Sequence, residues 1–136
     1  IEAIAKEESD LIIEKYARVS SYEECLNIAV EFILKNRRAT LHIYNSSNRD
    51  IYERYLMQLC QYVVETYLDT AFGERHISAG DRSVIVLSYK CHCFGLFVDW
   101  LNTGLKDDIQ PMLNRLCELR RGMIDEMIDR AEAAAR

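Results

Sequence analysis

The sequence predicts an all-α protein of about six helices, arranged as a single domain over residues 1–136. Three observations support this. The chain contains one proline and five glycines, so residues that interrupt helices are few. Apolar side chains recur at intervals of three and four residues along most of the chain. With 136 residues, 49% of them hydrophobic, it can bury a core without a disulfide or a structural metal.

The first half of the chain predicts four helices, one of them short. A helix over residues 1–18 is followed by Ser20 and Ser21, either of which fits a capping box that opens a second helix. Residues 39–44 have strand propensity, but no second strand follows, so they predict a short helix. Residues 49–72 predict a long helix, because leucine, valine and tyrosine recur there at helical spacing.

The most apolar segment, residues 81–105, predicts a central buried helix. Ser78 or Asp81 caps its start, and Gly104 ends it. Its apolar side chains form two adjacent sectors, Val86, Tyr89, Cys93, Leu96, Phe97 and Trp100 in one and Leu87, Cys91, Phe94, Val98 and Leu101 in the other. One sector can face the domain interior, and the other then needs a neighbouring helix or a second subunit. The sequence leaves open which sector does which.

A final amphipathic helix is predicted over residues 108–131. Asp107 or Asp108 caps its start, and Pro111 falls in the first turn, where its missing N–H is harmless. A broad apolar stripe follows the helix from Ile109 onwards.

Charge and cysteine usage exclude several classes of protein. The net charge is −5 and no Lys/Arg run exceeds two residues, so the basic face needed for nucleic-acid binding is missing. The five cysteines lack zinc-finger or CxxC spacing, which indicates reduced, buried thiols in a cytoplasmic protein. No signal peptide and no apolar run long enough to cross a membrane are evident, so we expect no membrane partner.

The sequence gives little support for metal binding or for catalysis. Cys91, His92 and Cys93 are potential zinc ligands, but consecutive helical residues point about 100° apart and cannot close on one ion. The chain contains no nucleophile elbow, no glycine-rich phosphate loop and no HExxH motif. We therefore expect no metal, no cofactor and no enzymatic activity.

A narrow polar strip runs along the central helix and has two interpretations. It consists of Ser88, His92, Gly95, Asp99 and Asn102. The strip is either a solvated seam or part of a subunit interface in which His92 meets Asp99 of the partner subunit.

Tyrosines are the strongest sign of a ligand. Tyr55 and Tyr62 are seven residues apart, so they share one side of their helix. Aromatic groups with a polar tip suit a mostly apolar pocket, although the same pattern also occurs in a core whose hydroxyls reach water. The predicted ligand-binding residues are Tyr55, Leu59, Tyr62, Tyr89, Cys93 and Trp100.

Three residue pairs follow one another in and just after the central helix: Phe94-Gly95, Trp100-Leu101 and Gly104-Leu105. This order resembles the penultimate helix of TetR-type transcriptional regulators, above all their C-terminal domain common in Firmicutes. Residues 1–18 would correspond to the helix that links the DNA-binding unit to the ligand domain. No residues match the helix-turn-helix unit itself. The resemblance therefore implies a chain that carries only the effector-binding and dimerisation part, and that reaches DNA through a missing N-terminal domain.

The resemblance also implies a homodimer in which the last two helices of each subunit form a four-helix interface. The predicted interface residues are Leu87, Phe94, Val98, Leu101, Leu116, Met123, Ile124 and Met127. A cavity for a small-molecule effector would lie between the earlier helices and the central one. The predicted function is ligand sensing in a repressor-like regulator. The alternative is a purely structural dimerisation or protein-interaction domain without a ligand.

Overall fold

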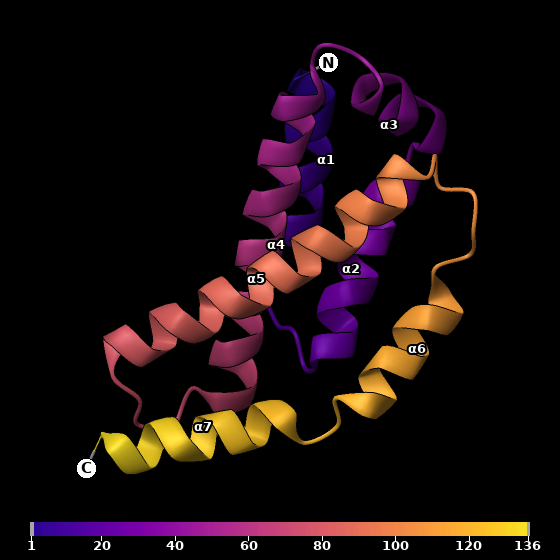
Figure 1. The fold of residues 1–136 in the computed structure, drawn as a ribbon. Coiled ribbons are helices and arrows are strands. Elements are labelled where there is room, and N and C mark those ends of the chain that lie inside the picture. Colours follow the sequence, from indigo (N-terminus) through magenta and orange to yellow (C-terminus); the bar gives the residue numbers. More distant parts are fainter. Residues whose placement is uncertain (1, 136) are drawn as a thin grey trace.

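A computed structural model describes residues 2–135, without the side chains of Glu2 and Ile4. Residue 1, with which the first predicted helix begins, lies outside this range. The described residues form seven helices and no strand, which confirms the all-α prediction (Figure 1). The helices are α1 (Glu2–Lys15), α2 (Tyr22–Leu34), α3 (Arg37–Tyr44), α4 (Arg49–Phe72), α5 (Ala79–Asn102), α6 (Gln110–Leu119) and α7 (Met123–Ala134).

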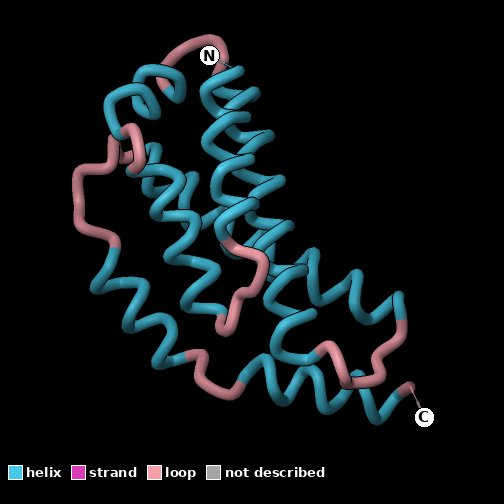
Figure 2. Tube along the Cα trace, turned by 180° about the vertical axis from the view of Figure 1, so that it is seen from behind, coloured by secondary structure: helices cyan, strands magenta, loops and turns pink. Residues whose placement is uncertain are grey.

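Helix α4 is the centre of the fold, because α1, α2 and α5 all pack against it. Its inward side chains Leu56, Leu59, Cys60 and Val63 are completely buried. Helix α6 runs along α2, and α7 crosses the far end of the domain (Figures 1 and 2). The chain from α6 to α7 therefore forms an outer arm around the central helices.

Serine caps set where α2 and α5 begin. The Ser21 hydroxyl accepts a hydrogen bond from the Glu24 N–H at 3.1 Å, and the Glu24 carboxylate accepts one from the Ser20 N–H at 3.0 Å. At α5 the cap is Ser78, whose hydroxyl accepts from the Asp81 N–H at 3.1 Å. The caps predicted for α2 and α5 are thus present, and Ser78 rather than Asp81 takes this role at α5. At α6 the predicted cap by Asp107 or Asp108 is wrong, because the N-cap position is Ile109, which forms no side-chain cap hydrogen bond.

Residues 39–44 lie in a helix, as predicted, and tertiary contacts explain why their strand propensity has no effect. Asn36 caps α3 by accepting from the Ala39 N–H at 3.4 Å. The Thr40 hydroxyl is buried and donates to the Ile33 carbonyl oxygen at 3.1 Å. Tyr44, almost fully buried, packs edge-on against Tyr52 of α4.

The prediction of one continuous final helix over residues 108–131 is wrong, since the structure divides it into α6 and α7 (Figure 1). Helix α6 ends at Leu119, and Gly122 then adopts a left-handed φ of 82°. Glycine tolerates this conformation because it has no Cβ. The apolar stripe continues on both sides of the break, so periodicity alone does not reveal it.

Helix α5 buries the first of its two apolar sectors. Val86, Tyr89, Cys93, Phe97 and Trp100 are all buried. In the second sector Leu87 and Cys91 are exposed, and only Leu101 is buried. The exposure of Cys91 contradicts the prediction that all five thiols are buried. The tertiary structure thus assigns the first sector to the domain interior.

The statement that no apolar run could span a membrane also needs correction. By length and composition alone, α5 is apolar enough to cross a bilayer, and it is the one such helix among the described residues. In the fold it is a core helix, because its first sector packs into the domain.

Candidate functional site

The six side chains predicted to bind a ligand do not surround one cavity. Leu59 and Cys93 are 0% exposed and belong to the packed core. The Tyr62 hydroxyl donates to the Tyr16 carbonyl oxygen at 2.9 Å and so faces α1. Trp100 Nε1 donates to the Asp107 carbonyl oxygen at 2.9 Å, which ties α5 to the loop after it.

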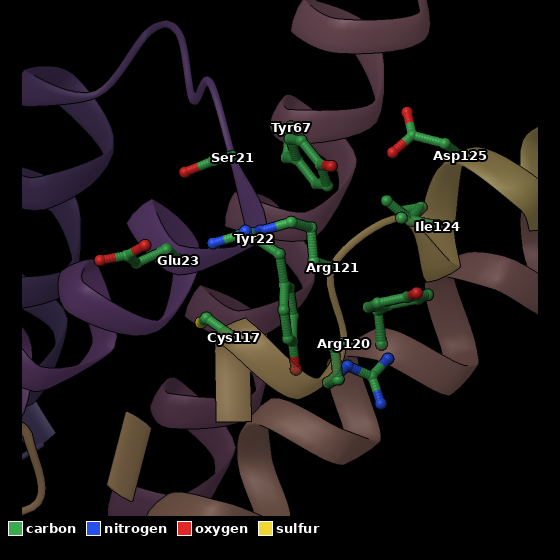
Figure 3. A pocket seen from close by; sticks show the side chains of 11 residues that line it. Ser21, Tyr22, Glu23, Tyr67, Cys117, Arg120, Arg121, Ile124 and Asp125 are labelled. Carbon is green, nitrogen blue, oxygen red and sulfur yellow. The ribbon is translucent and has the colours of Figure 1, made fainter. Parts of the chain in front are cut away.

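Of the two remaining residues, Tyr55 is half-buried on α4, whereas Tyr89 reaches a cleft at another place. This cleft has a volume of about 200 Å³ and opens where the turn between α6 and α7 passes the start of α2 (Figure 3). It is lined by Ser21, Tyr22, Glu23, Tyr67, Tyr89, Cys117, Arg120, Arg121, Gly122, Ile124 and Asp125.

Two local features build the cleft. The Ser21 cap makes Tyr22 the first residue of α2, which places this tyrosine at the end of the helix. Helix α6 ends at Leu119, and the left-handed conformation of Gly122 then turns the chain into α7. Arg120 and Arg121 therefore lie in a turn beside Tyr22 instead of on a straight helix (Figure 3).

Tyr22 joins α2 to α5 through two contacts. Its ring packs edge-on against Tyr89, with ring centres 5.0 Å apart. Its hydroxyl is hydrogen-bonded to Nδ1 of His92. Burial lowers the pKa of His92, and the positive charge of Arg120 lowers it further. Burial also raises the pKa of Tyr22 well above its usual value, so this bond joins a protonated tyrosine to a neutral imidazole.

Arg120 lies over both tyrosines. Its guanidinium carbon is 5.4 Å from the ring centre of Tyr22 and 5.1 Å from that of Tyr89, within cation–π range. Among the described residues Arg120 forms no ion pair. Its Nε–H is buried without an acceptor, which costs about 1–3 kcal/mol. The cleft therefore holds a cation with unused hydrogen-bonding capacity.

Tyr67 and Asp125 lie on another side of the cleft (Figure 3). Burial is the largest of the effects that raise the pKa of Tyr67, and the charge of Asp125 adds to it. The cleft thus combines tyrosine rings, two arginines and two carboxylates, Glu23 and Asp125. This arrangement can bind a small polar molecule with an apolar part, whereas the described residues contain no cluster suited to a metal ion.

Sequence reasoning missed Arg120 as a site residue, because it assigned residues 120–122 to the interior of a continuous helix. One signal was available: a glycine inside an amphipathic pattern can mark a helix end, and Gly122 follows two arginines.

Comparison with known proteins decides the family. A family model described as a transcriptional regulator C-terminal region, of the TetR type, matches residues 20–122, well over half of the chain. The chain belongs to this TetR-type family. The match confirms the resemblance, and it covers α2 to α6 together with the turn that carries Arg120. No curated protein and no solved structure matches the chain.

Most residues predicted for the interface of this TetR-type domain retain accessible surface. Leu87 is 56% exposed and Met123 is 47% exposed. Half-buried positions are Phe94, Val98, Leu116, Ile124 and Met127. Leu101 is only 1% exposed, so within this subunit it is a core residue. Val84 and Leu119, which were not predicted, are also largely exposed.

The polar strip of α5 is mostly exposed within this subunit, which fits both a solvated seam and a subunit interface. Ser88, Gly95, Asp99 and Asn102 are accessible, and the Asn102 side chain accepts a hydrogen bond from the Tyr44 hydroxyl at 2.9 Å. His92 is the exception, because it turns toward Tyr22 of its own subunit. That contact engages Nδ1 of the imidazole within the subunit.

Proposed function

We propose that this TetR-type domain binds a small molecule in the cleft between the start of α2 and the α6–α7 turn, and that binding regulates transcription without catalysis. One observation carries the proposal. The Arg120 guanidinium lies over Tyr22 and Tyr89 without an ion-pair partner in the described chain, next to an open volume of about 200 Å³. A ligand that supplies an acceptor would pair with guanidinium N–H donors of Arg120 at the cleft surface.

Signal transfer to α1 follows from how the first loop is held. Ser21 and Tyr22 line the cleft, so a ligand contacts the start of α2 directly. The loop before them is held to α4, since the Val19 N–H donates to the Thr70 hydroxyl at 3.2 Å. A displaced α2 start would therefore strain this loop and move the end of α1.

The end of α1 is also attached to the body of α2. Glu31 accepts hydrogen bonds from the Tyr16 hydroxyl at 2.7 Å and from Lys15 Nζ at 2.9 Å. A ligand with different affinities for two positions of α2 would thus shift the population of α1 positions. A DNA-binding unit that precedes α1 in the full regulator would receive this shift, and the domain itself would not touch DNA.

Dimerisation is part of the proposed function. Val84 and Leu87 on α5 and Met123 on α7 are large, exposed apolar side chains. Covering such a surface with a second copy would stabilise a twofold dimer. We propose that the exposed side of α5 contributes with α7 to this interface in a cytoplasmic protein.

The sensing function is tested by a thermal-shift screen of small molecules, followed by hydrogen exchange of the complete chain. We expect any compound that raises the unfolding temperature through the cleft to lose its effect in Tyr67→Ala. The same compound should alter amide exchange in residues 16–21 and in α1. A compound that binds the cleft and leaves α1 exchange unchanged would contradict the sensing proposal.

A second function, a dimerisation or protein-interaction domain without a ligand, is favoured by the packed interior. The region predicted to hold an effector is filled, since Leu59 and Cys93 have no accessible surface. A stable dimer that no compound of the screen stabilises would support this function over sensing.

A further inference from the structure

We propose that the cleft at the α6–α7 turn takes a small organic monocarboxylate with one ring or a short apolar chain. This inference rests on the proposed sensing function and gives its ligand a chemical class.

The guanidinium N–H groups of Arg120 favour a carboxylate as the polar group of the ligand. The Tyr22 and Tyr89 rings contact the guanidinium group at centroid distances of 5.4 and 5.1 Å. The two rings stand at 83° to each other, so they contact the guanidinium from two directions, and neither contact supplies a hydrogen-bond acceptor of the N/O type to its five N–H donors. Among the described residues none of these N–H groups has a side-chain or backbone acceptor. A carboxylate fits this fork because its two oxygens match two parallel N–H donors.

Neighbouring groups strengthen the positive potential beside Arg120. Arg121 also lines the cleft and forms no ion pair within the described chain. Helix α7 begins at the same place, with Gly122 as its N-cap. No side chain caps this end of α7, and the carboxylates of Asp125 and Glu126 in its first turn offset part of the positive end of the helix dipole.

Two carboxylates limit the charge of the ligand. Glu23 and Asp125 line the cleft together with Arg120 and Arg121, so the formal charges of the lining balance. A ligand with one negative charge gains the arginine contact with limited repulsion. A dianion such as a phosphate monoester is repelled more strongly by both acidic groups.

The cleft also limits the size of the ligand. Its volume of about 200 Å³ is below the range of about 300–1,000 Å³ for pockets that hold drug-sized molecules. Tyr67, Tyr89 and Ile124 supply apolar surface beside the charged groups. A single ring or a short alkyl chain fits this space.

Calorimetric titration of the complete chain tests the inference with two acid–amide pairs: benzoate with benzamide, and hexanoate with hexanamide. Phenylphosphonate serves as the dianion. We expect at least one carboxylate to bind about tenfold or more tightly than its amide, because the amide lacks the charge. Phenylphosphonate should bind less tightly than benzoate.

Arg120→Gln should weaken binding of the carboxylate about tenfold or more and remove its advantage over the amide. The matched control is Arg115→Gln, since Arg115 lies on α6 outside the cleft and pairs with Glu118 at 2.9 Å. This control should bind as the unmodified chain does. If Arg120→Gln fails to fold, Arg120→Lys replaces it, and we expect weaker carboxylate binding with a remaining preference over the amide.

Equal affinity for acid and amide, tighter binding of phenylphosphonate, or unchanged carboxylate binding in Arg120→Gln would overturn the inference. So would the failure of both carboxylates to bind at millimolar concentration. These results would leave sensing of another ligand class intact. Conversely, carboxylate binding at Arg120 that leaves the hydrogen exchange of α1 unchanged would support the ligand class and contradict sensing.

Discussion

The hydroxyl of Tyr22, at the start of α2, is hydrogen-bonded to Nδ1 of His92, seventy residues later in the middle of α5. This bond connects two helices that the sequence gives no reason to pair at these positions. The imidazole is neutral at neutral pH, and its protonation would add a second positive charge beside Arg120 in a half-buried site. The start of α2, and with it the wall of the cleft, therefore depends on the charge of His92.

Stability should fall on acidification through His92. Burial, followed by the charge of Arg120, lowers the pKa of His92 in the folded protein below the ordinary value of 6.5. Between these two pKa values the unfolded chain binds a proton that the folded chain does not, so the free energy of unfolding rises with pH. We expect the contribution of His92 to be complete above pH 6.5 and to decrease as the pH falls through the folded pKa.

Urea unfolding at fixed protein concentration from pH 7.5 to pH 5 measures this effect, with the pH range set by an unperturbed histidine pKa of about 6.5. His92→Gln should reduce the pH dependence, whereas His42→Gln at an exposed position should retain it. Identical pH profiles for the unmodified chain and His92→Gln would show that His92 is not the responsible group.

Gly122→Ala should destabilise the fold. At its φ of 82° an alanine Cβ is strained even though no atom lies within 4 Å of it. The expected loss is about 1–2 kcal/mol in the free energy of unfolding. The matched control is Gly95→Ala, an exposed position inside α5 with equally open space, where alanine should stabilise by about 0.5–1 kcal/mol. Urea unfolding that gives the same sign for both substitutions would contradict the role of the left-handed turn.

Tyr62→Phe should loosen the end of α1. The Tyr62 hydroxyl donates to the Tyr16 carbonyl oxygen at 2.9 Å, so its removal leaves that carbonyl without this donor. We expect a loss of about 1 kcal/mol in stability and faster amide exchange in the last turn of α1. Tyr67→Phe is the control, because no hydrogen bond of the described residues involves its hydroxyl. An unchanged α1 in Tyr62→Phe would contradict the proposed attachment.

Leu87→Glu should dissociate the proposed dimer. Leu87 is 56% exposed on α5, and a charge at a covered apolar position costs enough to weaken association about tenfold or more. Leu34→Glu, at the 39% exposed end of α2, is the control and should not alter association. Analytical ultracentrifugation across a concentration series measures both. A Leu87→Glu variant that associates as the unmodified chain does would place the interface elsewhere.

Local chemistry was sufficient to predict the helices up to α5, but not the break between α6 and α7. The serine caps at Ser21 and Ser78, the glycine at position 104 and the helical spacing of apolar residues act within a few positions of one another. For the same reason the family resemblance of the segment around Trp100 was accessible from the sequence, and the family match confirmed it. These features need no knowledge of how distant segments meet.

The candidate site depended on tertiary structure. Tyr55 and Tyr62 share one side of α4. Only the packing of α1 against α4 shows that the Tyr62 hydroxyl donates a hydrogen bond to the Tyr16 carbonyl oxygen. Arg120 became a site residue because Gly122 adopts a left-handed conformation and the turn then meets Tyr22 from the start of α2.

The sequence by itself thus determined the all-α class, the capped starts of α2 and α5, and the family, because these follow from periodicity and from contacts between near neighbours. Only the tertiary structure decided which side of α5 is buried and where the cleft lies. The physical reason is that a helix apolar on two sides is compatible with either orientation. Packing against α4 buries the side that carries Cys93 and Phe97 and leaves Leu87 exposed.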